Sequence, residues 1–281
     1  MRIAVVGAGI SGIASAYLLS RAHDVVLYEA QARLGGHTHT HDVELGGRAY
    51  AIDTGFIVCN PAHYPLFMRF LAELRVATQP TTMSFAVRND ASGLEYNATS
   101  IAGLFLQKRR LVSPRHWRMI GDILRFYREA RALLDAPWPG PSLDEYLDTH
   151  GYSNAFRDDH LVPMASALWS SPSRQVLQFP AKHLVAFMAN HHMLQARDRP
   201  EWRVVRGGSS SYVRAAEQRW SAQVRLDSAV ASVRRTHDGV DVTAAGGTER
   251  YDEVVFACHA DEALALLDDP STGEREVLGA F

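Results

Sequence analysis

The sequence has few cysteines and no long apolar run. Only Cys59 and Cys258 occur in 281 residues, a number typical of free thiols rather than of a disulfide framework. We therefore expect a reducing, cytoplasmic environment. No stretch approaches the roughly 20 apolar residues that a transmembrane helix needs. The apolar start at 3–19 is interrupted by glycines and continues into a second apolar segment, so we interpret it as fold rather than as a signal peptide.

An excess of charge of one sign is also lacking. The chain has 29 Lys and Arg residues and 31 Asp and Glu residues, which leaves a net charge of -2. Such a chain has no global field that would attract nucleic acid, so no nucleic-acid partner is expected.

One segment departs from this balance. Residues 102–135 carry eight basic and three acidic side chains, and Trp117, Ile120, Leu124 and Tyr127 fall at helical spacing within it. We interpret this pattern as a solvated helix that packs its apolar stripe on the core. A basic amphipathic helix in peripheral contact with a membrane is the alternative.

The first thirty residues have the pattern of a βαβ unit. A β-branched run at 2–6 is followed by Gly7-Ala8-Gly9-Ile10-Ser11-Gly12, by a helical stretch to Arg21 and by a second apolar strand at 24–29. This order of strand, glycine turn, helix and strand is typical of dinucleotide-binding folds.

Each glycine of the turn has its own expected role. Gly7 allows the tight turn, Gly9 lets the backbone approach a pyrophosphate, and Gly12 lets the helix lie close to the strand. The helix N-terminus offers unpaired N–H groups to phosphate, and Glu29 ends the second strand, where an acid binds ribose hydroxyls. The unit is therefore predicted to bind a dinucleotide.

The sequence just beyond Glu29 narrows the choice of dinucleotide. Ala30-Gln31-Ala32-Arg33-Leu34-Gly35-Gly36-His37-Thr38 resembles the flavin-dependent amine oxidase superfamily, which includes monoamine oxidases, protoporphyrinogen oxidase and phytoene desaturases. In that family an Arg-x-Gly-Gly segment crosses the pyrophosphate. The resemblance implies that Arg33 supplies positive charge there and that Gly35 and Gly36 permit close approach. His37 stands where the family usually has arginine.

The resemblance covers both ends of the chain. Asp53-Thr54-Gly55-Phe56-Ile57 is similar to the segment beside the flavin ring, and Arg206-Gly207-Gly208 to the re-entry into the flavin domain. It also implies that the backbone of Val230 contacts adenine and that a strand at 254–258 closes this half of the site. The residues expected at the cofactor are Gly7, Gly9, Ser11, Gly12, Glu29, Ala30, Arg33, Gly35, Gly36, His37, Thr38, Thr54, Gly55, Phe56, Ile57, Val230 and Ala257.

The expected fold class is α/β. A discontinuous, Rossmann-like FAD-binding domain, with a parallel sheet and a β-meander crossover, is expected at 1–57 and 206–281. An inserted, mainly helical substrate domain is expected at 58–205, because this section lacks a second glycine fingerprint. Further expected strands are 50–58, 82–88, 224–233, 240–244 and 251–257, and expected helical segments are 100–135, 142–150, 153–169, 179–195 and 207–220.

The resemblance implies FAD as cofactor and hydride transfer from an apolar small molecule, lipid-like or an amine, to the flavin N5. No residue emerges as a catalytic acid or base. The alternatives are an NAD(P)-dependent dehydrogenase and a non-catalytic dinucleotide-binding protein. The family's C-terminal Gly-Asp motif does not occur before Phe281, so we expect a fragment that holds FAD weakly.

A metal site is a further alternative, because His37, His39 and His41 alternate along an extended segment. No acid or cysteine at ligand spacing completes such a site, so no metal is expected.

Overall fold

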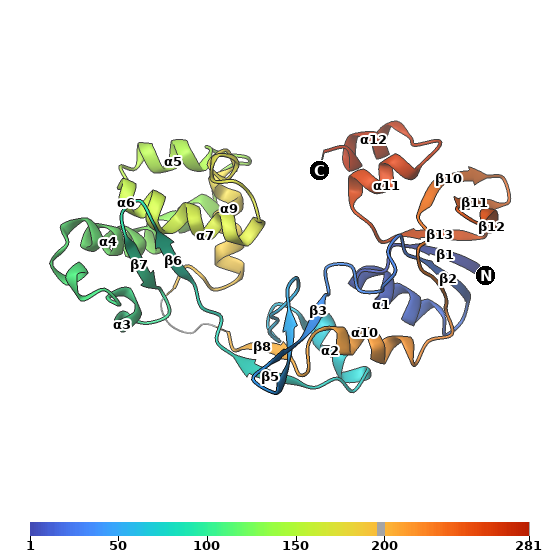
Figure 1. Ribbon diagram of the computed structural model, residues 1–281. Coiled ribbons are helices and arrows are strands. Elements are labelled where there is room, and N and C mark those ends of the chain that lie inside the picture. Colours follow the sequence, from blue (N-terminus) through green and yellow to red (C-terminus); the bar gives the residue numbers. More distant parts are fainter. Residues whose placement is uncertain (196–199, 281) are drawn as a thin grey trace. The chain divides into compact units, whose positions relative to one another are not determined.

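The computed structural model describes residues 1–195 and 200–280, which form two compact units (Figure 1). The first unit comprises Met1–Thr81 and Arg203–Phe281, and the second comprises Thr82–Trp202. An insertion was expected between residues 58 and 205. The boundaries between the units instead fall after Thr81 and after Trp202, because residues 58–81 pack with the N-terminal part of the chain.

A four-stranded parallel sheet forms the centre of the first unit. Its strand order is β13 (Glu253–Phe256), β1 (Arg2–Val6), β2 (Asp24–Tyr28) and β9 (Gln223–Arg225). Parallel strands buried on both faces are apolar along their buried length, as residues 3–6 and 25–28 are. Val5 and Leu27 pack toward helix α1 (Ile10–Leu19), whereas Ala4 and Val26 pack toward an antiparallel meander. The predicted α/β class is thereby confirmed.

The meander consists of β10 (Val230–Thr236), β11 (Gly239–Ala244) and β12 (Gly247–Tyr251). Four expected strands were wrong in their extent. The strand expected at 50–58 spans Arg48–Asp53, and the one expected at 82–88 spans Ala86–Asn89. The segment 224–233 is divided between β9 and β10, because Asp227 takes a left-handed backbone conformation with φ of 50°. The segment 251–257 is divided too, since the meander ends at Tyr251 and Glu253–Phe256 joins the parallel sheet.

A second apolar cluster explains why residues 58–81 belong to the first unit. Helix α2 (Pro65–Glu73), which was not predicted, places Leu71 beside Ile13 and Tyr17 of α1 and Tyr212 of α10 (Ser210–Glu217). Strand β5 (Thr78–Thr81) then pairs with β8 (Trp202–Val205). A hairpin of β3 (Thr40–Leu45) and β4 (Arg48–Asp53) precedes α2.

The second unit is mainly helical, as predicted, with one hairpin. Strands β6 (Ala86–Asn89) and β7 (Leu94–Asn97) pair antiparallel, and Phe126, Leu147, Phe156 and Leu184 lie in its core. Its helical segments are α3 (Ile101–Leu104), η1 (Lys108–Val112), α4 (Pro114–Glu129), η2 (Ala130–Leu134), α5 (Leu143–Thr149), α6 (Asn154–Phe156), η3 (Arg157–Leu161), α7 (Val162–Trp169), α8 (Ser173–Val176) and α9 (Ala181–Asn190). Two short helices, α11 (Ala260–Leu266) and α12 (Thr272–Leu278), end the first unit. None of the helices in the described ranges has the length and apolar content needed to cross a bilayer.

Helix α4 buries a different face from the one predicted. The stripe of Trp117, Ile120, Leu124 and Tyr127 was expected to pack on the core. Ile120 and Tyr127 do so, but Trp117 and Leu124 remain 50% and 58% exposed. The helix instead buries His116, Met119, Asp122, Ile123 and Phe126. Because this buried face contains the polar residues His116 and Asp122, the hydropathy pattern of the sequence did not identify it. His116 bonds to the Leu104 carbonyl at 2.8 Å, and Asp122 accepts the Ser153 N–H at 3.0 Å, so both are satisfied when buried.

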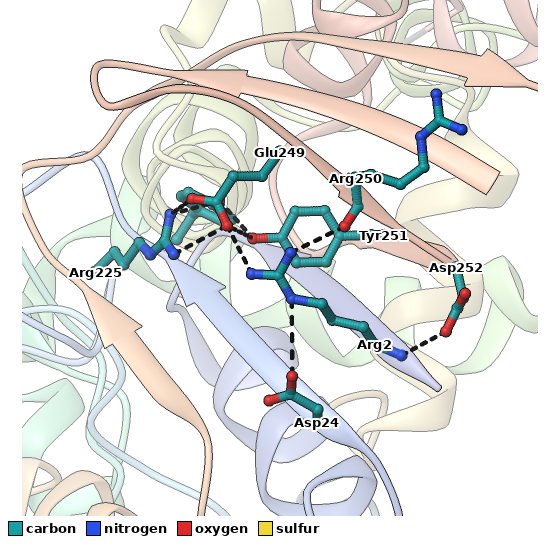
Figure 2. A network of polar contacts seen from close by, with 8 residues as sticks. Arg2, Asp24, Arg225, Glu249, Arg250, Tyr251 and Asp252 are labelled. Carbon is teal, nitrogen blue, oxygen red and sulfur yellow. Dashed lines mark hydrogen bonds and ion pairs between the residues drawn. The ribbon is translucent and has the colours of Figure 1, made fainter.

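A polar network joins the parallel sheet to the meander (Figure 2). The Glu249 carboxylate on β12 accepts hydrogen bonds from Arg2 on β1, at 2.6 Å, and from Arg225 on β9. Beneath them the buried hydroxyls of Tyr28 and Tyr251 lie 2.6 Å apart. The guanidinium of Arg225, followed by that of Arg2, lowers the pKa of Glu249 to about 2.

We expect Glu249→Gln to destabilise the protein at neutral pH by about 1 kcal/mol, because the network is partly exposed and screened by solvent. The folded pKa lies below the ordinary value of 4.5, so the carboxylate contributes fully above pH 4.5 and loses its effect as pH falls toward 2. Urea unfolding at pH 7, 4 and 3 measures this. A difference from the parent that stays constant over this range would contradict the assignment.

Candidate cofactor site

Gly7 and Gly12 of the first turn have to be glycines because other backbone atoms of the protein lie too close for a side chain. Gly7 has φ of +98°, and a Cβ added there would lie 2.8 Å from the Ala257 carbonyl oxygen. A Cβ on Gly12 would lie 1.8 Å from the Gly7 carbonyl oxygen. Gly7 also donates to the Tyr28 carbonyl at 2.8 Å, which ties the turn to the end of β2. These glycines let α1 start directly on the sheet.

Gly9 differs, because the fold gives no reason for a glycine at this position. Its φ of -69° and ψ of -174° suit any residue, and no atom lies within 4 Å of an added Cβ. The space beside Gly9 is therefore open. Gly9 caps α1, which has neither a side-chain cap nor an acidic residue in its first turn, so first-turn amides are left for an anion. Ser11 is exposed in this turn.

The second glycine pair closes over the first turn, as its predicted role requires. The Gly35 amide donates to the Ala8 carbonyl at 2.8 Å, and a Cβ on Gly36 would lie 3.0 Å from the Gly9 Cα. The backbone of the Gly35-Gly36 loop thus forms one wall of the open space at Gly9. Backbone amides without side chains in front of them are typical of anion sites, so the binding of a pyrophosphate at Gly9 stays a prediction.

Glu29 lies at the carboxyl end of β2, next to the glycine turn. Its carboxylate is buried and accepts the Ala8 N–H at 2.8 Å and the Gln31 N–H at 2.9 Å. A carboxylate has about four acceptor positions, so two remain for ribose hydroxyls. These two contacts fix the carboxylate in place, and its contact with ribose stays a prediction.

Arg33 has a structural role that its sequence context did not reveal. Its guanidinium donates to the Gly36 carbonyl at 2.9 Å and to the Thr38 carbonyl at 3.2 Å. Arg33 therefore braces the loop that carries the glycine pair. Its direct contact with phosphate stays a prediction.

His37 and Thr38 point into different surroundings. Thr38 is 3% exposed, its hydroxyl bonds to Tyr212, and its N–H donates to the Gly35 carbonyl at 2.9 Å. Its contact with a ligand stays a prediction. His37 is exposed, and its ring lies 5.9 Å from that of His259. The rings of His39 and His41 pair with each other at 4.0 Å. Among the described residues, no three His, Cys, Asp or Glu side chains gather as a metal would require.

The segment Thr54–Ile57 lies against the residues that follow the glycine pair. The Thr54 amide donates to the His39 carbonyl and the Phe56 amide to the His37 carbonyl, at 3.0 and 3.2 Å. A Cβ on Gly55 would lie 1.8 Å from the His37 carbonyl oxygen, so this contact requires glycine. Ile57 is 46% exposed at the end of the segment.

Asp53 and Ser209, which were not expected at the site, hold this segment against the re-entry at Gly207-Gly208 by hydrogen bonds. The Asp53 carboxylate accepts hydrogen bonds from the amide and hydroxyl of Ser209 at 2.9 to 3.0 Å, and the Ser209 hydroxyl also reaches the Phe56 carbonyl at 3.0 Å. Asp53 is the first residue of the motif 53–57, and Ser209 directly follows the motif Arg206-Gly207-Gly208. Their partnership joins residues that are 156 positions apart, so no local pattern signalled it.

The remaining predicted residues border the same strand ends. The Ser228 amide donates to the Glu29 carbonyl at 2.8 Å, which places the stretch before Val230 beside Glu29 and Ala30. The Ala257 amide donates to the Val6 carbonyl at 2.8 Å. The structure thus gathers the adenosine-side residues at the carboxyl ends of β1, β2 and β13, where ligands of such sheets bind.

The chain is similar to flavoenzymes in sequence. It is 26% identical over 283 residues to AofH of Mycobacterium tuberculosis, which is assigned by name to the flavin-containing monoamine oxidases; this match covers 95% of the chain and 59% of that protein. A shorter match, 37% identical over 82 residues, links 28% of the chain to 14% of tryptophan 2-monooxygenase of Pseudomonas savastanoi.

Solved structures show the same fold. Putrescine oxidase bound to putrescine matches 99% of the chain with a TM-score of 0.70 at 20% identity, and a fatty acid isomerase of P. acnes matches 99% with a TM-score of 0.65 at 16% identity. The chain spans 63% of each of these proteins, and so about three fifths of its relatives' length. Residues 10–281 match the sequence model of the flavin containing amine oxidoreductases, and the chain therefore belongs to this family, as its motifs predicted.

Proposed function

We propose that this chain supplies the adenosine- and pyrophosphate-binding part of an FAD-dependent oxidoreductase of the amine oxidase type. The observation that carries the proposal is the open space at Gly9, which is walled by the Gly35-Gly36 backbone and adjoins the fixed carboxylate of Glu29. Membership of a flavin-containing family supports FAD as the cofactor and disfavours the NAD(P)-dependent dehydrogenase. The bound flavin supplies the redox chemistry by accepting a hydride at N5.

The protein's own groups hold and orient the cofactor in this proposal. The backbone at Gly9 and the first-turn amides of α1 bind the diphosphate oxygens, and Glu29 accepts hydrogen bonds from the ribose hydroxyls. The backbone of Val230 contacts adenine, and residues 54–57 lie beside the flavin ring. Arg33 and the pair of Asp53 and Ser209 keep these walls in place through the hydrogen bonds described above.

The substrate is proposed to be an apolar small molecule, lipid-like or an amine, taken up by the helical second unit. Putrescine oxidase and a fatty acid isomerase share the fold, which supports both classes. A peripheral membrane contact through residues 102–135 belongs to the same proposal. The free thiols of Cys59 and Cys258 support a cytoplasmic localisation of the protein.

A non-catalytic dinucleotide-binding protein is the second candidate. The specific observation in its favour is that the predicted site residues with described contacts gather around Gly9 and Glu29, at the carboxyl ends of β1 and β2.

Titration with ADP tests the proposal. We expect the parent to bind ADP and Glu29→Gln to bind it about tenfold to a hundredfold more weakly, because a charge-assisted hydrogen bond to ribose contributes about 1.5 to 3 kcal/mol. Glutamine keeps the shape of the side chain but only one of the two oxygens that accept the Ala8 and Gln31 N–H groups, so the fold of the variant has to be checked beside its affinity. Calorimetry measures binding, and circular dichroism of the variant checks its fold. Equal affinity of the two proteins would refute the ribose contact.

A further inference from the structure

The second unit exposes apolar side chains along one stretch, Ile101–Trp117. Val112 and Ile101, which are 84% and 80% exposed, are the two most exposed large apolar side chains in the described chain. Leu106, Leu111 and Trp117 are between 50% and 61% exposed. Single exposed apolar residues are ordinary, but a group of them marks a binding surface.

Local contacts hold this stretch in a defined conformation. The Ser100 hydroxyl caps α3 by accepting the Gly103 N–H at 3.0 Å, and the Trp117 indole donates to the Leu111 carbonyl at 2.8 Å. The rings of Phe105 and Trp117 lie 4.9 Å apart. The side chains are thus exposed from an ordered segment.

Positive charge lies in the middle of the same stretch. Lys108, Arg109 and Arg110 are consecutive, and the sequence has no acidic residue between Glu95 and Asp122. Arg109 and Arg110 bond to the carbonyls of Gly93 and Ser92, contacts that leave their charge uncompensated. In the part of the chain that the structure describes, none of the three cations forms an ion pair with a carboxylate. The neighbouring Arg115 does, with the buried Asp159 at 2.7 Å.

We propose that the stretch Ile101–Trp117, the basic apolar surface, docks on an anionic lipid bilayer. Its cations would meet lipid phosphates, its aliphatic side chains would enter the interface, and Trp117 would lie at headgroup depth. This sharpens the membrane contact proposed above and moves it from the face of α4 to the segment before that helix. It does not depend on dinucleotide binding.

The shape of the surface favours a bilayer over a protein partner. Protein partners anchor aromatic or aliphatic side chains in pockets. One hollow beside this stretch, of about 250 Å³, is lined by Arg88, Asn89, Asp90, Gly93, Leu94 and Glu95, and these mainly polar residues offer no apolar seat for such an anchor. The other, lined by Leu94, Arg110, His116 and Met119 among others, has a volume of about 40 Å³. That space holds little more than water, whereas a bilayer needs no pocket.

Sedimentation with vesicles tests the proposal. We expect the parent to bind phosphatidylglycerol-containing vesicles, to release them as salt rises, and to bind pure phosphatidylcholine much more weakly. Lys108→Glu changes the charge by two and should lower the partition coefficient about 25-fold, since each surface charge contributes roughly a factor of five. Lys108→Glu with Val112→Asp should lower it at least about a hundredfold. Both side chains are at the surface, so the fold should tolerate these changes.

Two matched controls lie elsewhere on the protein. Leu66→Asp changes a side chain that is 77% exposed in the first unit, and Arg174→Glu reverses an exposed charge on α8. Both should bind vesicles like the parent. Equal binding to neutral and anionic vesicles, no binding at all, or an equal loss in the controls would overturn the proposal. So would a Val112→Asp variant that changes only the oligomeric state in gel filtration. ADP titration of the same variants separates this result from a failure of the cofactor site.

Discussion

The Gly9→Val variant is expected to lose at least about two orders of magnitude in ADP affinity while staying folded. Its side chain would occupy the open space at Gly9, where the protein itself makes no contact. The diphosphate would lose its backbone hydrogen bonds and the helix N-terminus, which together contribute several kcal/mol, and each 1.4 kcal/mol is about tenfold. Exchange of glycine for valine at the N-cap costs about 1 kcal/mol of stability at most. Calorimetry and thermal unfolding measure the two effects separately.

Gly12→Ala is the matched control for this variant. Its added Cβ would lie 1.8 Å from the Gly7 carbonyl oxygen, so α1 would have to leave the sheet. We expect a loss of stability of about 3 kcal/mol or more, and loss of ADP binding only through unfolding. A Gly9→Val protein that is unfolded, or one that binds ADP like the parent, would show that the open space is not the phosphate site.

The second large effect concerns the flavin half of the cofactor. We expect the chain of residues 1–281 to bind FAD less than about tenfold more tightly than ADP, because Gly9, Glu29, Gly36 and Val230 address only the shared ADP part. Two or three charge-assisted contacts to the ribityl chain and ring, at about 1.5 to 3 kcal/mol each, would make FAD bind thousands of times more tightly than ADP.

Parallel titrations with FAD, ADP and FMN measure this difference. FMN, which lacks the adenosine half, should show no saturable binding, and Glu29→Gln should weaken FAD and ADP by the same factor. A protein that purifies yellow with stoichiometric flavin would disprove the expectation. It would mean that residues such as Thr54–Ile57 suffice to hold the ring.

The sequence predicted the cofactor unit far better than the rest of the fold. The βαβ pattern places Gly7, Gly12 and Glu29 within thirty residues, so their roles follow from local spacing. The hydrogen bonds between Asp53 and Ser209 depend on a contact across 156 positions, and no local pattern reports it. The structural role of Arg33 was not predicted, because an arginine beside an expected phosphate site is interpreted first as a phosphate ligand.

The errors in the second unit have a different physical cause. Hydropathy cannot identify a buried face whose polar members are satisfied by hydrogen bonds, as His116 and Asp122 are in α4. The segment 100–135 read as one helix, but Pro114 fits only a first turn, and the hydroxyl of Ser113 accepts the His116 N–H there. Helix α2 was missed since it is short and begins after a proline-rich turn.

The polar network around Glu249 also determines the order in which the two units can fold during synthesis. Its bond to Arg2 joins residues 247 positions apart, and β1 needs Glu253–Phe256 beside it to complete the sheet. The first unit therefore cannot close until almost the whole chain has left the ribosome. The contiguous unit Thr82–Trp202, whose contacts are more local, is complete earlier and is expected to fold first. Until then strand 2–6 lacks its neighbour 253–256, which leaves an unpaired strand edge on the nascent first unit.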